Sequence, residues 1–256
     1  MNDNKVKHIL ENGKKSYGVG LNIMAPGLVE LIGLSGFDFV ILDDQHSWMD
    51  YFSAADLIRT AENVGLTPMV RVSDVRSPTI GKMLDLGAKG IVFPNVNTAD
   101  DAKKAVGSVK YEPYGTRSSC PTVRSVGYSS DRWEEHYEHA NKNIFTLMII
   151  ETREGFDNIE DILDVEGIDA VLLGPFDLSS SLGIPGQVGH PEVIERVVRS
   201  KKIIADRGLI LCDWNLEFDF KSNLDNSNAQ MFWFSGTKIF HDALRGYVAQ
   251  IRGGVD

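Results

Sequence analysis

The chain has 256 residues, of which 43% are hydrophobic and 24% are charged, and its formal net charge at pH 7 is −10. This length suits one barrel domain, and the composition is ordinary for a globular protein. The acidic balance argues against nucleic acid and anionic membranes as partners, since both attract basic proteins. No apolar run of about 18 residues is present, so we expect no membrane-spanning helix.

The first 15 residues are polar and charged and lack the apolar core of a signal peptide. Cys120 and Cys212 are far apart in the sequence and do not have the spacing of metal ligands. Two reduced thiols are typical of a protein in a reducing compartment. We therefore expect a cytoplasmic protein.

Short apolar runs alternate with amphipathic stretches along the whole chain. Some runs, such as residues 39–42 and 170–173, are apolar at every position, which is typical of parallel strands covered on both faces. The predicted strands are Tyr17–Ile23, Phe37–Leu42, Pro68–Val72, Gly90–Pro94, Phe145–Ile150, Ala170–Leu173, Leu209–Cys212 and Met231–Phe234. Stretches with helical spacing lie between them, including Ala54–Val64, Ala99–Val106 and Pro191–Ala205. The alternation predicts an α/β protein of a single (β/α)₈ TIM-barrel domain over residues 1–256, with an open doubly wound sheet as the competing topology.

Two absent motifs favour the barrel over the open sheet. The first predicted strand is not followed by a Gly-x-Gly-x-x-Gly turn, and no Walker-type phosphate loop is present. The longest connection runs over Tyr111–Asn143 and includes a helix-like stretch from Asp131 to His139. We interpret it as a βα connection that forms an active-site loop or a subunit contact.

Polar residues follow four of the predicted strands at the point where each strand ends. These residues are Asp43-Asp44-Gln45-His46, Arg71, Glu151-Thr152-Arg153-Glu154 and Gly174-Pro175-Phe176-Asp177. In barrels the chemistry lies at the carboxyl ends of the strands. The sequence therefore predicts one face that carries a histidine, an arginine and several carboxylates.

Glu151 and Asp177 are candidate ligands of a divalent cation, because Mg²⁺ typically binds one or two carboxylates together with water and substrate oxygens. The alternative is that each is a solvated loop carboxylate or a helix cap. Asp177 would then cap a helix that begins at Leu178. Both interpretations are open from these residues alone.

His46 and Arg71 are the candidates for proton transfer and for substrate binding. A histidine beside Asp43 or Asp44 has the chemistry of a general base, although a lone histidine is more often a packing or capping residue. Arg71 ends an apolar run, so its guanidinium needs an anionic or carbonyl partner. That partner is a substrate keto or carboxylate group, an internal salt bridge to Asp43 or Asp44, or both. Asp85, before a predicted strand, has no assigned role on spacing alone.

The remaining histidines and the lysines near strands carry no predicted role. His136 and His139 have i,i+3 spacing, and we predict that they lie on a solvated helix face. Lys89 and Lys110 are predicted to be exposed. Because no lysine ends an apolar strand, a Schiff-base mechanism is disfavoured and metal activation is the alternative.

These residues resemble the HpcH/HpaI family of class II, metal-dependent pyruvate aldolases from about Gly18 to Ser180. The matching pieces are Gly36-Phe37-Asp38-Phe39-Val40-Ile41-Leu42-Asp43 with His46, Val70-Arg71, Leu84-Asp85-Leu86-Gly87-Ala88, Tyr111-x-Pro-x-Gly-x-Arg117, Ile150-Glu151-Thr152-Arg153-Glu154 and Gly174-Pro175-Phe176-Asp177-Leu178-Ser179. The order and spacing of the last two pieces make the resemblance specific.

The resemblance implies a barrel with a swapped C-terminal helix in a homo-oligomer, a hexamer or trimer. It implies that Glu151 and Asp177 bind Mg²⁺, Mn²⁺ or Co²⁺, and that the pyruvate carboxylate meets backbone N–H groups between Gly174 and Asp177, including that of Phe176. Arg71 would contact the keto oxygen. His46, in a dyad with Asp43 or Asp85, would govern proton transfer through a metal-bound water.

This sequence departs from the family pattern on the side that would select the aldehyde. Gln45 stands where the family usually has Glu, and Ser118 stands where it usually has Gly. Gly20 replaces a frequent aromatic residue, which predicts a wider aldehyde pocket. After Gly208 the match fades, and neither Asp213-Trp214 nor Ser235-Gly236-Thr237 fits.

The predicted function is reversible aldol cleavage of a 4-hydroxy-2-oxo acid to pyruvate and an aldehyde. One alternative is an acyl-CoA lyase of the malyl- or citramalyl-CoA type, which needs basic groups for the CoA phosphates. Lys103-Lys104 and Lys201-Lys202 are the basic pairs available. Another alternative is a non-catalytic barrel that binds a 2-oxo acid, which Gln45 and Ser118 would favour.

Overall fold

The protein is a closed barrel of parallel strands in the computed structural model, which describes residues 4–215 and 227–253. The strands follow one another in chain order around the barrel, and β8 pairs with β1 to close it. Their bounds are β1 Ser16–Leu21, β2 Phe39–Asp43, β3 Thr67–Arg71, β4 Gly90–Phe93, β5 Phe145–Ile150, β6 Ala170–Leu173, β7 Ile210–Asn215 and β8 Met231–Ser235. The predicted TIM barrel is confirmed, and the open doubly wound sheet is wrong.

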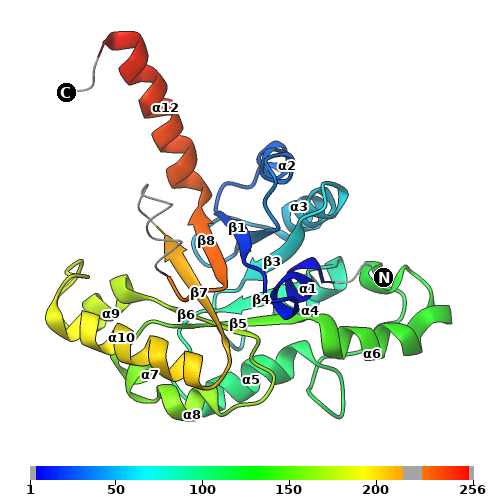
Figure 1. Cartoon of the computed structure of the whole chain (residues 1–256). Helices are drawn as coiled ribbons and strands as arrows, with labels where there is room; N and C mark the ends of the chain where they lie inside the picture. The colour runs from blue at the N-terminus through cyan, green and yellow to red at the C-terminus, as the bar shows by residue number, and fades with distance from the viewer. Residues whose placement is uncertain (1–3, 216–226, 254–256) are drawn as a thin grey trace.

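Helices surround the barrel (Figure 1). They are α1 Lys5–Glu11, α2 Pro26–Leu34, α3 Tyr51–Asn63, α4 Ile80–Leu86, α5 Ala99–Val109, α6 Trp133–Asn143, α7 Arg153–Asp157, α8 Ile159–Leu163, α9 Pro175–Ser181, α10 Pro191–Asp206 and α12 Gly236–Arg252, with short 3₁₀ turns at Arg124–Val126 and Ser130–Arg132. None of the helices within the described ranges has the length and apolarity needed to cross a bilayer.

The strands are apolar on both faces because each face packs into a different core. Phe39, Ile41 and Trp233 belong to a cluster inside the barrel. Val40 and Leu42, which alternate with them on β2, belong to a second cluster between strands and helices that includes Leu57 of α3. Alternation of the two faces along one strand is the period-two geometry of β-structure. The same alternation aims Asp43 into the barrel mouth at the carboxyl end of β2.

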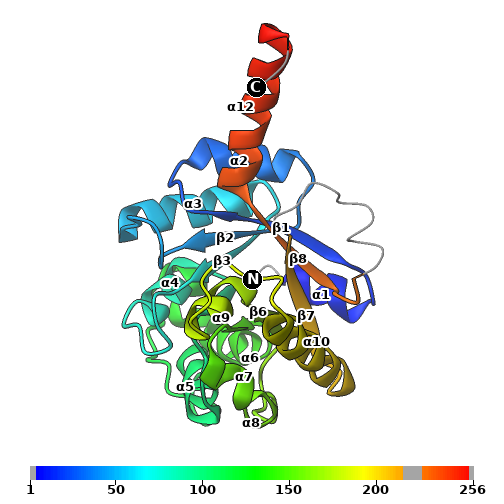
Figure 2. The ribbon, with the colours of Figure 1, turned by 90° about the vertical axis from the view of Figure 1, so that its left-hand side faces the viewer.

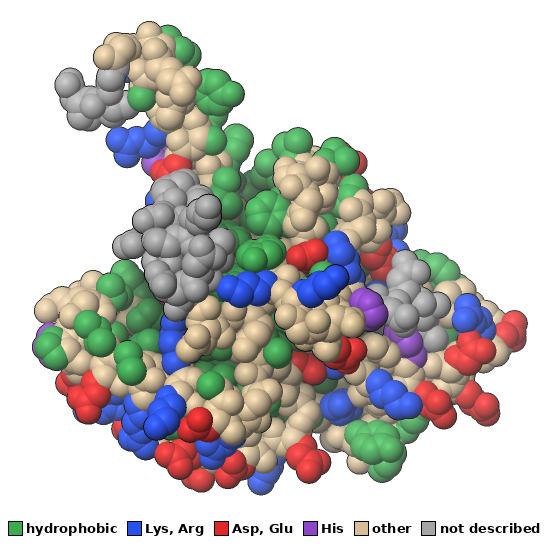
Figure 3. Space-filling model, in the orientation of Figure 1, with side chains coloured by type: hydrophobic (Ala, Val, Ile, Leu, Met, Phe, Trp, Pro, Cys, Tyr) green, Lys and Arg blue, Asp and Glu red, His purple; other side chains and the backbone are tan. Residues whose placement is uncertain are grey.

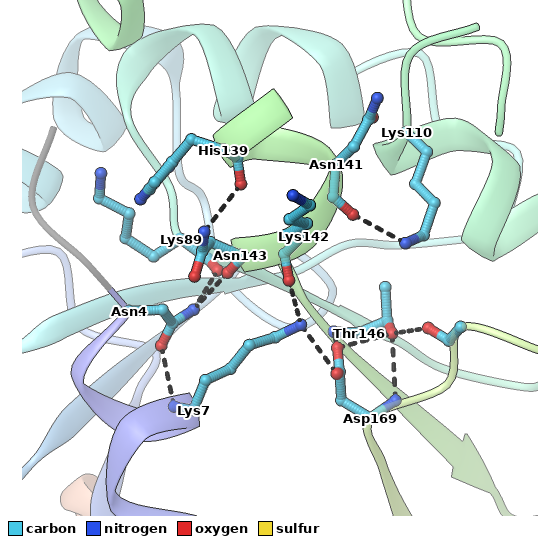
Figure 4. A network of polar contacts seen from close by, with 11 residues as sticks. Asn4, Lys7, Lys89, Lys110, His139, Asn141, Lys142, Asn143, Thr146 and Asp169 are labelled. Atoms are coloured by element: carbon cyan, nitrogen blue, oxygen red, sulfur yellow. Dashed lines mark hydrogen bonds and ion pairs between the residues drawn. The ribbon is translucent and has the colours of Figure 1, made fainter. Parts of the chain in front are cut away.

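Helix α1 closes the amino end of the barrel. Its Val6 and Leu10 join the interior cluster, and the Asn4 side chain before it donates to the carbonyl oxygens of Lys89 and Asn143, both at 2.8 Å. Lys7 of α1 forms an ion pair with Asp169 at 2.8 Å (Figure 4). These contacts tie the residues that precede β4, β5 and β6 to one helix, so the amino end is sealed and the site lies at the other end.

The long connection over residues 110–143 follows α5 and leads into β5, so it lies at the amino end of the strands. The prediction of a βα connection that forms an active-site loop is therefore wrong within one chain. The connection has a core of its own: Tyr111 is fully buried and stacks on Tyr137 of α6, with ring centroids 5.4 Å apart. This packing explains how a connection of this length keeps a fixed shape.

His136 belongs to the same core and is buried, so its predicted place on a solvated helix face is wrong. Its Nε2 lies 3.2 Å from the Tyr111 hydroxyl. Burial, reinforced by the charge of Arg117, lowers the pKa of His136 to about 4. The imidazole is therefore neutral near pH 7. His139 is only partly exposed.

Helix α12 extends away from the barrel in both ribbon views (Figures 1 and 2). None of its residues is buried. Its apolar residues recur at helical spacing and are exposed: Phe240, Leu244, Tyr247, Val248 and Ile251. Figure 3 shows hydrophobic side chains along this helix. An amphipathic helix with most of its apolar face exposed lacks the packing that normally stabilises it.

Candidate active site

Asp43 and Arg71 form a buried ion pair at the carboxyl ends of β2 and β3. Arg71 Nε donates to Asp43 Oδ1 at 2.8 Å, and the guanidinium NH2 group donates to Oδ2 at 2.5 Å. The register between the strands places the two residues directly opposite each other. The predicted internal salt bridge of Arg71 is therefore present with Asp43. Two of the five N–H donors of the guanidinium are used in this pair, which leaves its other edge for a substrate oxygen.

The residues after β2 fold back onto Asp43. The backbone N–H groups of Gln45 and His46 donate to Asp43 Oδ1 at 3.0 and 3.3 Å. The His46 side chain is exposed, and its imidazole makes no hydrogen bond within residues 4–215 and 227–253. A ring-to-carboxylate dyad with Asp43 therefore stays a prediction. Burial raises the pKa of the adjacent Asp44, partly opposed by a hydrogen bond from Thr79.

The side-chain oxygen of Gln45 is buried and has no hydrogen-bond partner among the described residues. A buried amide oxygen left unpaired costs free energy, so such a group is expected to meet a ligand or water at a functional site. Gln45 lies beside Asp43, to which its backbone N–H donates, and its role in substrate binding stays a prediction.

Glu151 follows β5 and is buried, with 7% of its surface exposed. The backbone N–H of Asn95 donates to Glu151 Oε1 at 2.9 Å, and Asn95 holds a left-handed backbone conformation with φ +53°. Asparagine tolerates this region better than most residues. Burial raises the pKa of Glu151 to about 7, the Asn95 N–H opposes the shift, and the charge of Asp177 adds to it.

Asp177 lies in the first turn of α9, which begins at Pro175 with Gly174 as its N-cap residue. The prediction that Asp177 would cap a helix beginning at Leu178 is therefore wrong. A Cβ on Gly174 would lie 2.5 Å from the Glu151 Cβ, so only glycine allows β5 and β6 to bring the two acidic segments this close. The Gly174 N–H donates to the Ile150 carbonyl. The N–H groups of Phe176 and Asp177 remain for a carboxylate, because first-turn donors have no intrahelical acceptor.

The Glu151 and Asp177 pair fits a divalent cation by its chemistry. The Asn95 N–H contacts only Oε1 of Glu151, so Oε2 is available to a cation. Asp177 is near enough to raise the Glu151 pKa through its charge and a side-chain hydrogen bond. Glu151 is buried and Asp177 is exposed, and two neighbouring carboxylates repel each other unless a proton or a cation lies between them. Within the described ranges no group of three or more acidic, histidine or cysteine side chains could hold a metal, so water and substrate would complete the coordination.

Asp85 is not brought to this site within one chain. It lies in the last turn of α4, close to where β4 begins, and forms an ion pair with Arg117 at 2.9 Å. The guanidinium of Arg117 also lies over the Tyr111 ring, 4.5 Å from its centroid. The structure therefore associates Asp85 with the amino-end connection, and a role for Asp85 beside His46 stays a prediction.

The space beside Gly20 is filled, which corrects the prediction of a wider pocket. A Cβ on Gly20 would lie 1.9 Å from Nε1 of Trp233, whose side chain enters the barrel from β8. The ring of Trp233 also lies 5.2 Å from the Arg71 guanidinium carbon. Neither Trp233 nor Asn95 was predicted as a site residue. Only the left-handed preference of asparagine after an apolar run could have indicated Asn95.

Lys89 and Lys110 are half-buried, so the prediction that they are exposed is wrong. Both lie at the amino end, where Lys110 Nζ donates to the Asn141 carbonyl at 2.9 Å. Burial lowers the pKa of Lys110. Their position away from the barrel mouth gives no support to a Schiff base at the site.

The family model described as HpcH/HpaI aldolase/citrate lyase matches residues 17–212. This chain belongs to the HpcH/HpaI aldolase/citrate lyase family. The predicted family is confirmed, and with it the prediction of a carbon–carbon lyase. The chain is similar to the 2-keto-3-deoxy-L-rhamnonate aldolase of Escherichia coli O157:H7, with 32% identity over 200 residues that cover 77% of this chain and 73% of the relative.

Solved structures of HpcH/HpaI-type enzymes resemble it over nearly the full chain. The citrate synthase SbnG is 32% identical with a TM-score of 0.87, and the alignment covers 97% of this chain and 98% of that one. The HpcH/HpaI aldolase from Desulfitobacterium hafniense DCB-2 is 29% identical with a TM-score of 0.89, over 96% of each chain. The family match ends at Cys212, before Trp214 and Trp233.

Proposed function

We propose that this HpcH/HpaI family member catalyses reversible, metal-dependent aldol cleavage of a 4-hydroxy-2-oxo acid to pyruvate and an aldehyde. The observation that carries the proposal is the meeting of two groups at one barrel mouth: the Asp43–Arg71 ion pair and the Glu151–Asp177 carboxylates. Both Arg71 and Asp177 act on the pKa of Glu151, so the two groups lie within electrostatic reach of each other. This is the layout that a chelated 2-oxo acid needs.

Glu151 and Asp177 would hold Mg²⁺, Mn²⁺ or Co²⁺, which supplies Lewis-acid polarisation of the 2-oxo group. Arg71 would donate from its unused edge to the keto oxygen. Its bond to Asp43 keeps the guanidinium plane fixed, so little reorganisation is needed when negative charge develops on that oxygen. The N–H groups of Phe176 and Asp177 would receive the substrate carboxylate.

His46 would govern the proton of the 4-hydroxyl group. Removal of that proton lets the C3–C4 bond break, the 4-carbon leaves as the aldehyde, and the bonding electron pair passes to the enolate of pyruvate. Return of a proton to C3 gives pyruvate, so the reaction is balanced without an oxidant. The exposed imidazole of His46 leaves room for a water between it and the substrate, which a proton relay requires.

The alternatives are weaker for reasons that the structure supplies. Of the basic residues available to bind CoA phosphates, Lys104 pairs with Asp100 and Lys201 with Asp213, so their charges are partly neutralised. A barrel that only binds a 2-oxo acid would not need a histidine beside the ion pair. Turnover distinguishes a lyase from such a binding protein directly.

The test is pyruvate release from a panel of 4-hydroxy-2-oxo acids, measured with Mg²⁺, Mn²⁺ or Co²⁺ and with EDTA. We expect release that requires metal. Glu151→Gln and Asp177→Asn should each reduce the metal-dependent rate to the level seen with EDTA. The matched control is Glu154→Gln, an exposed carboxylate in the first turn of α7, which should keep the wild-type rate.

The outcomes distinguish the aldolase from the 2-oxo-acid-binding barrel and from the acyl-CoA lyase. Wild-type activity in Glu151→Gln or Asp177→Asn would remove those residues from the metal site. Metal binding by calorimetry without turnover of any substrate would favour the 2-oxo-acid-binding barrel. Release of a CoA thioester product from malyl-CoA or citramalyl-CoA alone would favour the acyl-CoA lyase.

We also propose that α12 packs on a second copy of the chain, in a homo-oligomer. An apolar cavity of about 210 Å³ lies between the outer face of β1, helix α2 and the base of α12. Its lining includes Val19, Leu21, Leu28 and Phe37 of the barrel side and Ile239 and Phe240 at the base of α12. A second α12 laid across this groove would bury both apolar surfaces, and mutual exchange would close the assembly.

Light scattering after gel filtration tests the assembly. The wild type should elute as an oligomer of three or more chains, and Leu244→Glu, in the middle of the apolar face, should lower the mass. Arg245→Glu, on the adjacent exposed position, is the control and should leave the mass unchanged. A monomeric wild type would contradict the proposal.

We propose a cytoplasmic location on the state of the thiols. Cys120 and Cys212 are both free, and Cys212 is buried inside the barrel, where burial holds its pKa well above the ordinary value. Free thiols persist in reducing compartments. Thiol titration of freshly purified protein should find both cysteines reduced, and an intermolecular disulfide through Cys120 would argue against this location.

A further inference from the structure

Three strands of the barrel, β7, β8 and β1, carry an aromatic wall at the mouth. Trp214 of β7 and Trp233 of β8 are register partners, and their rings stack with centroids 5.1 Å apart and an interplanar angle of 14°. Trp233 is buried with 2% of its surface exposed, whereas Trp214 is 38% exposed. The stacked pair therefore reaches from the barrel interior to the solvent.

Gly20 on β1 is what admits this wall. The indole nitrogen of Trp233 lies where a side chain of residue 20 would begin, at 1.9 Å from an ideal Cβ. Any larger residue at position 20 must displace the Trp233 ring, because a carbon atom less than 3 Å from the ring would clash with it. The pair Gly20 and Trp233 thus places the aromatic group on β8 instead of β1.

The wall adjoins the group that holds the proposed substrate. The Arg71 guanidinium lies over the Trp233 ring, with its carbon 5.2 Å from the ring centroid, and Asp43 fixes one edge of Arg71. A 2-oxo acid bound between Arg71 and the Glu151–Asp177 pair has its C4 substituent free to extend beyond the guanidinium. Among the residues that the structure describes, the two indoles and Gly20 bound this space on the β7, β8 and β1 side.

The chemistry of the wall is apolar and uncharged. The acidic side chain next to Trp214, Asp213, alternates to the outer side of β7, where it pairs with Lys201 at 2.9 Å and accepts from Ser227. The rest of the mouth carries the carboxyl groups of Asp43, Asp44, Glu151 and Asp177. A ligand with a second carboxylate would meet like charges on one side and indole faces on the other.

We propose that Trp233 and Trp214 are specificity-determining residues that select an uncharged aldehyde whose substituent presents an apolar face, and that reject aldehydes bearing a carboxylate. The proposal rests on the proposed aldolase function and deepens it by naming the class of its second substrate. Stacked indoles contribute contact area and a polarisable face, and they offer no partner for a charged group.

The experiment measures aldol addition of pyruvate to two aldehydes of equal chain length, butanal and succinic semialdehyde, which differ in a terminal methyl or carboxylate. The wild type should have a kcat/KM for butanal at least about 10-fold above that for succinic semialdehyde, the factor given by roughly one buried methyl or one mispaired polar group. Trp214→Ala and Gly20→Ala should each reduce this ratio about 5- to 10-fold. The control is Trp48→Ala, which removes an exposed indole from the loop after β2 and should leave the ratio unchanged.

A second measurement keeps this proposal separate from the proposed function. Exchange of the pyruvate methyl protons with D₂O tests the metal and Arg71 half of the site without any aldehyde. If the wild type does not exchange, the aldolase proposal fails and this one fails with it. If exchange proceeds but neither aldehyde adds, or the wild type prefers succinic semialdehyde, only the specificity proposal is overturned.

The variants are read in the same way. An unchanged ratio in Trp214→Ala, with normal proton exchange, overturns the role of the wall. If Gly20→Ala does not fold, as judged by its thermal melt, Trp214→Ala decides alone, because its ring is partly exposed and its removal opens no closed cavity. A fall in proton exchange equal to the fall in aldehyde addition would also overturn the proposal, since it would show that the wall acts only on Arg71.

Discussion

The two sides of the barrel mouth differ in nearly every physical respect. On β2, β3, β5 and β6, ionisable groups are held by partners: Arg71 by both oxygens of Asp43, and Glu151 by the Asn95 N–H. On β7, β8 and β1, the inward positions are two indoles and a glycine. The first side lies inside the range matched by the family, and Trp214 and Trp233 lie beyond it.

The difference shows how the barrel separates reaction from selection. Charged groups that stabilise a transition state need fixed partners, since reorganising them during the reaction would cost the stabilisation they provide. An apolar wall needs only shape, so it can change residue by residue without disturbing the ion pair. The Trp233 indole lies against both Gly20 and Arg71, so this side chain joins the two sides.

The largest effect is expected from breaking the charged side at Asp43→Asn. Removal of one charge leaves the Arg71 guanidinium buried and unpaired, which costs about 3–5 kcal/mol of stability. The aldol rate should fall about 10²- to 10³-fold, as for the loss of one donor to a developing oxyanion. Denaturant unfolding and steady-state kinetics measure the two effects.

The matched control for this prediction is Asp44→Asn. Asp44 is only half-buried, and its side chain accepts a 3.5 Å hydrogen bond from the Thr79 hydroxyl. We expect a smaller loss of stability and of rate. Equal effects in the two variants would show that total charge at the mouth, and not the fixed Arg71 pair, sets the charged side apart.

A smaller effect is expected deeper on the apolar side, at Gly18→Ala. A Cβ there would lie 2.2 Å from the Phe39 ring inside the barrel, and such overpacking costs about 1–3 kcal/mol. Because Phe39 lies below the mouth, the ratio of aldehyde rates should not change. Gly18→Ala combined with Phe39→Leu should recover part of the stability. A change in the ratio of kcat/KM for the two aldehydes would show that residues below the mouth also affect aldehyde selection.

The sequence predicted the barrel, and it predicted an internal salt bridge of Arg71, which the structure contains with Asp43. Strands that are apolar on both faces can be recognised as continuous apolar runs, and β5 and β6 were predicted with the bounds observed. The residues that follow strands, such as Arg71 and Glu151, come together because parallel strands end on one face. The local sequence pattern at the strand ends therefore predicts which polar residues lie on this side of the mouth.

The apolar side could not be predicted because its contacts join distant parts of the chain. Trp233 meets Gly20 only through the pairing of β8 with β1 that closes the barrel. For Asp85 the family motif predicted a place beside His46, but within the chain Asp85 forms an ion pair with Arg117. Both cases depend on which residues meet across strands or connections, and periodicity along one element contains no record of that.

The connection at the amino end gives the last prediction and a reference for the mouth, since it buries an ionisable group with no part in the proposed reaction. His136 looks like a surface histidine because its helix is polar, but Tyr111 folds under it. Its pKa of about 4, set by burial and then by the charges of Arg117, His139 and Lys89, lies below the ordinary value of 6.5.

The unfolded chain therefore binds the proton first, and stability that is complete above pH 6.5 is lost as the pH falls toward 4. Between pH 7.5 and 5 this histidine should account for about 2 kcal/mol of the loss in unfolding free energy. Denaturant unfolding at the two pH values should show that difference shrinking in His136→Gln and persisting in His139→Gln, whereas an unchanged difference in His136→Gln would assign the pH dependence to the carboxylates of the mouth.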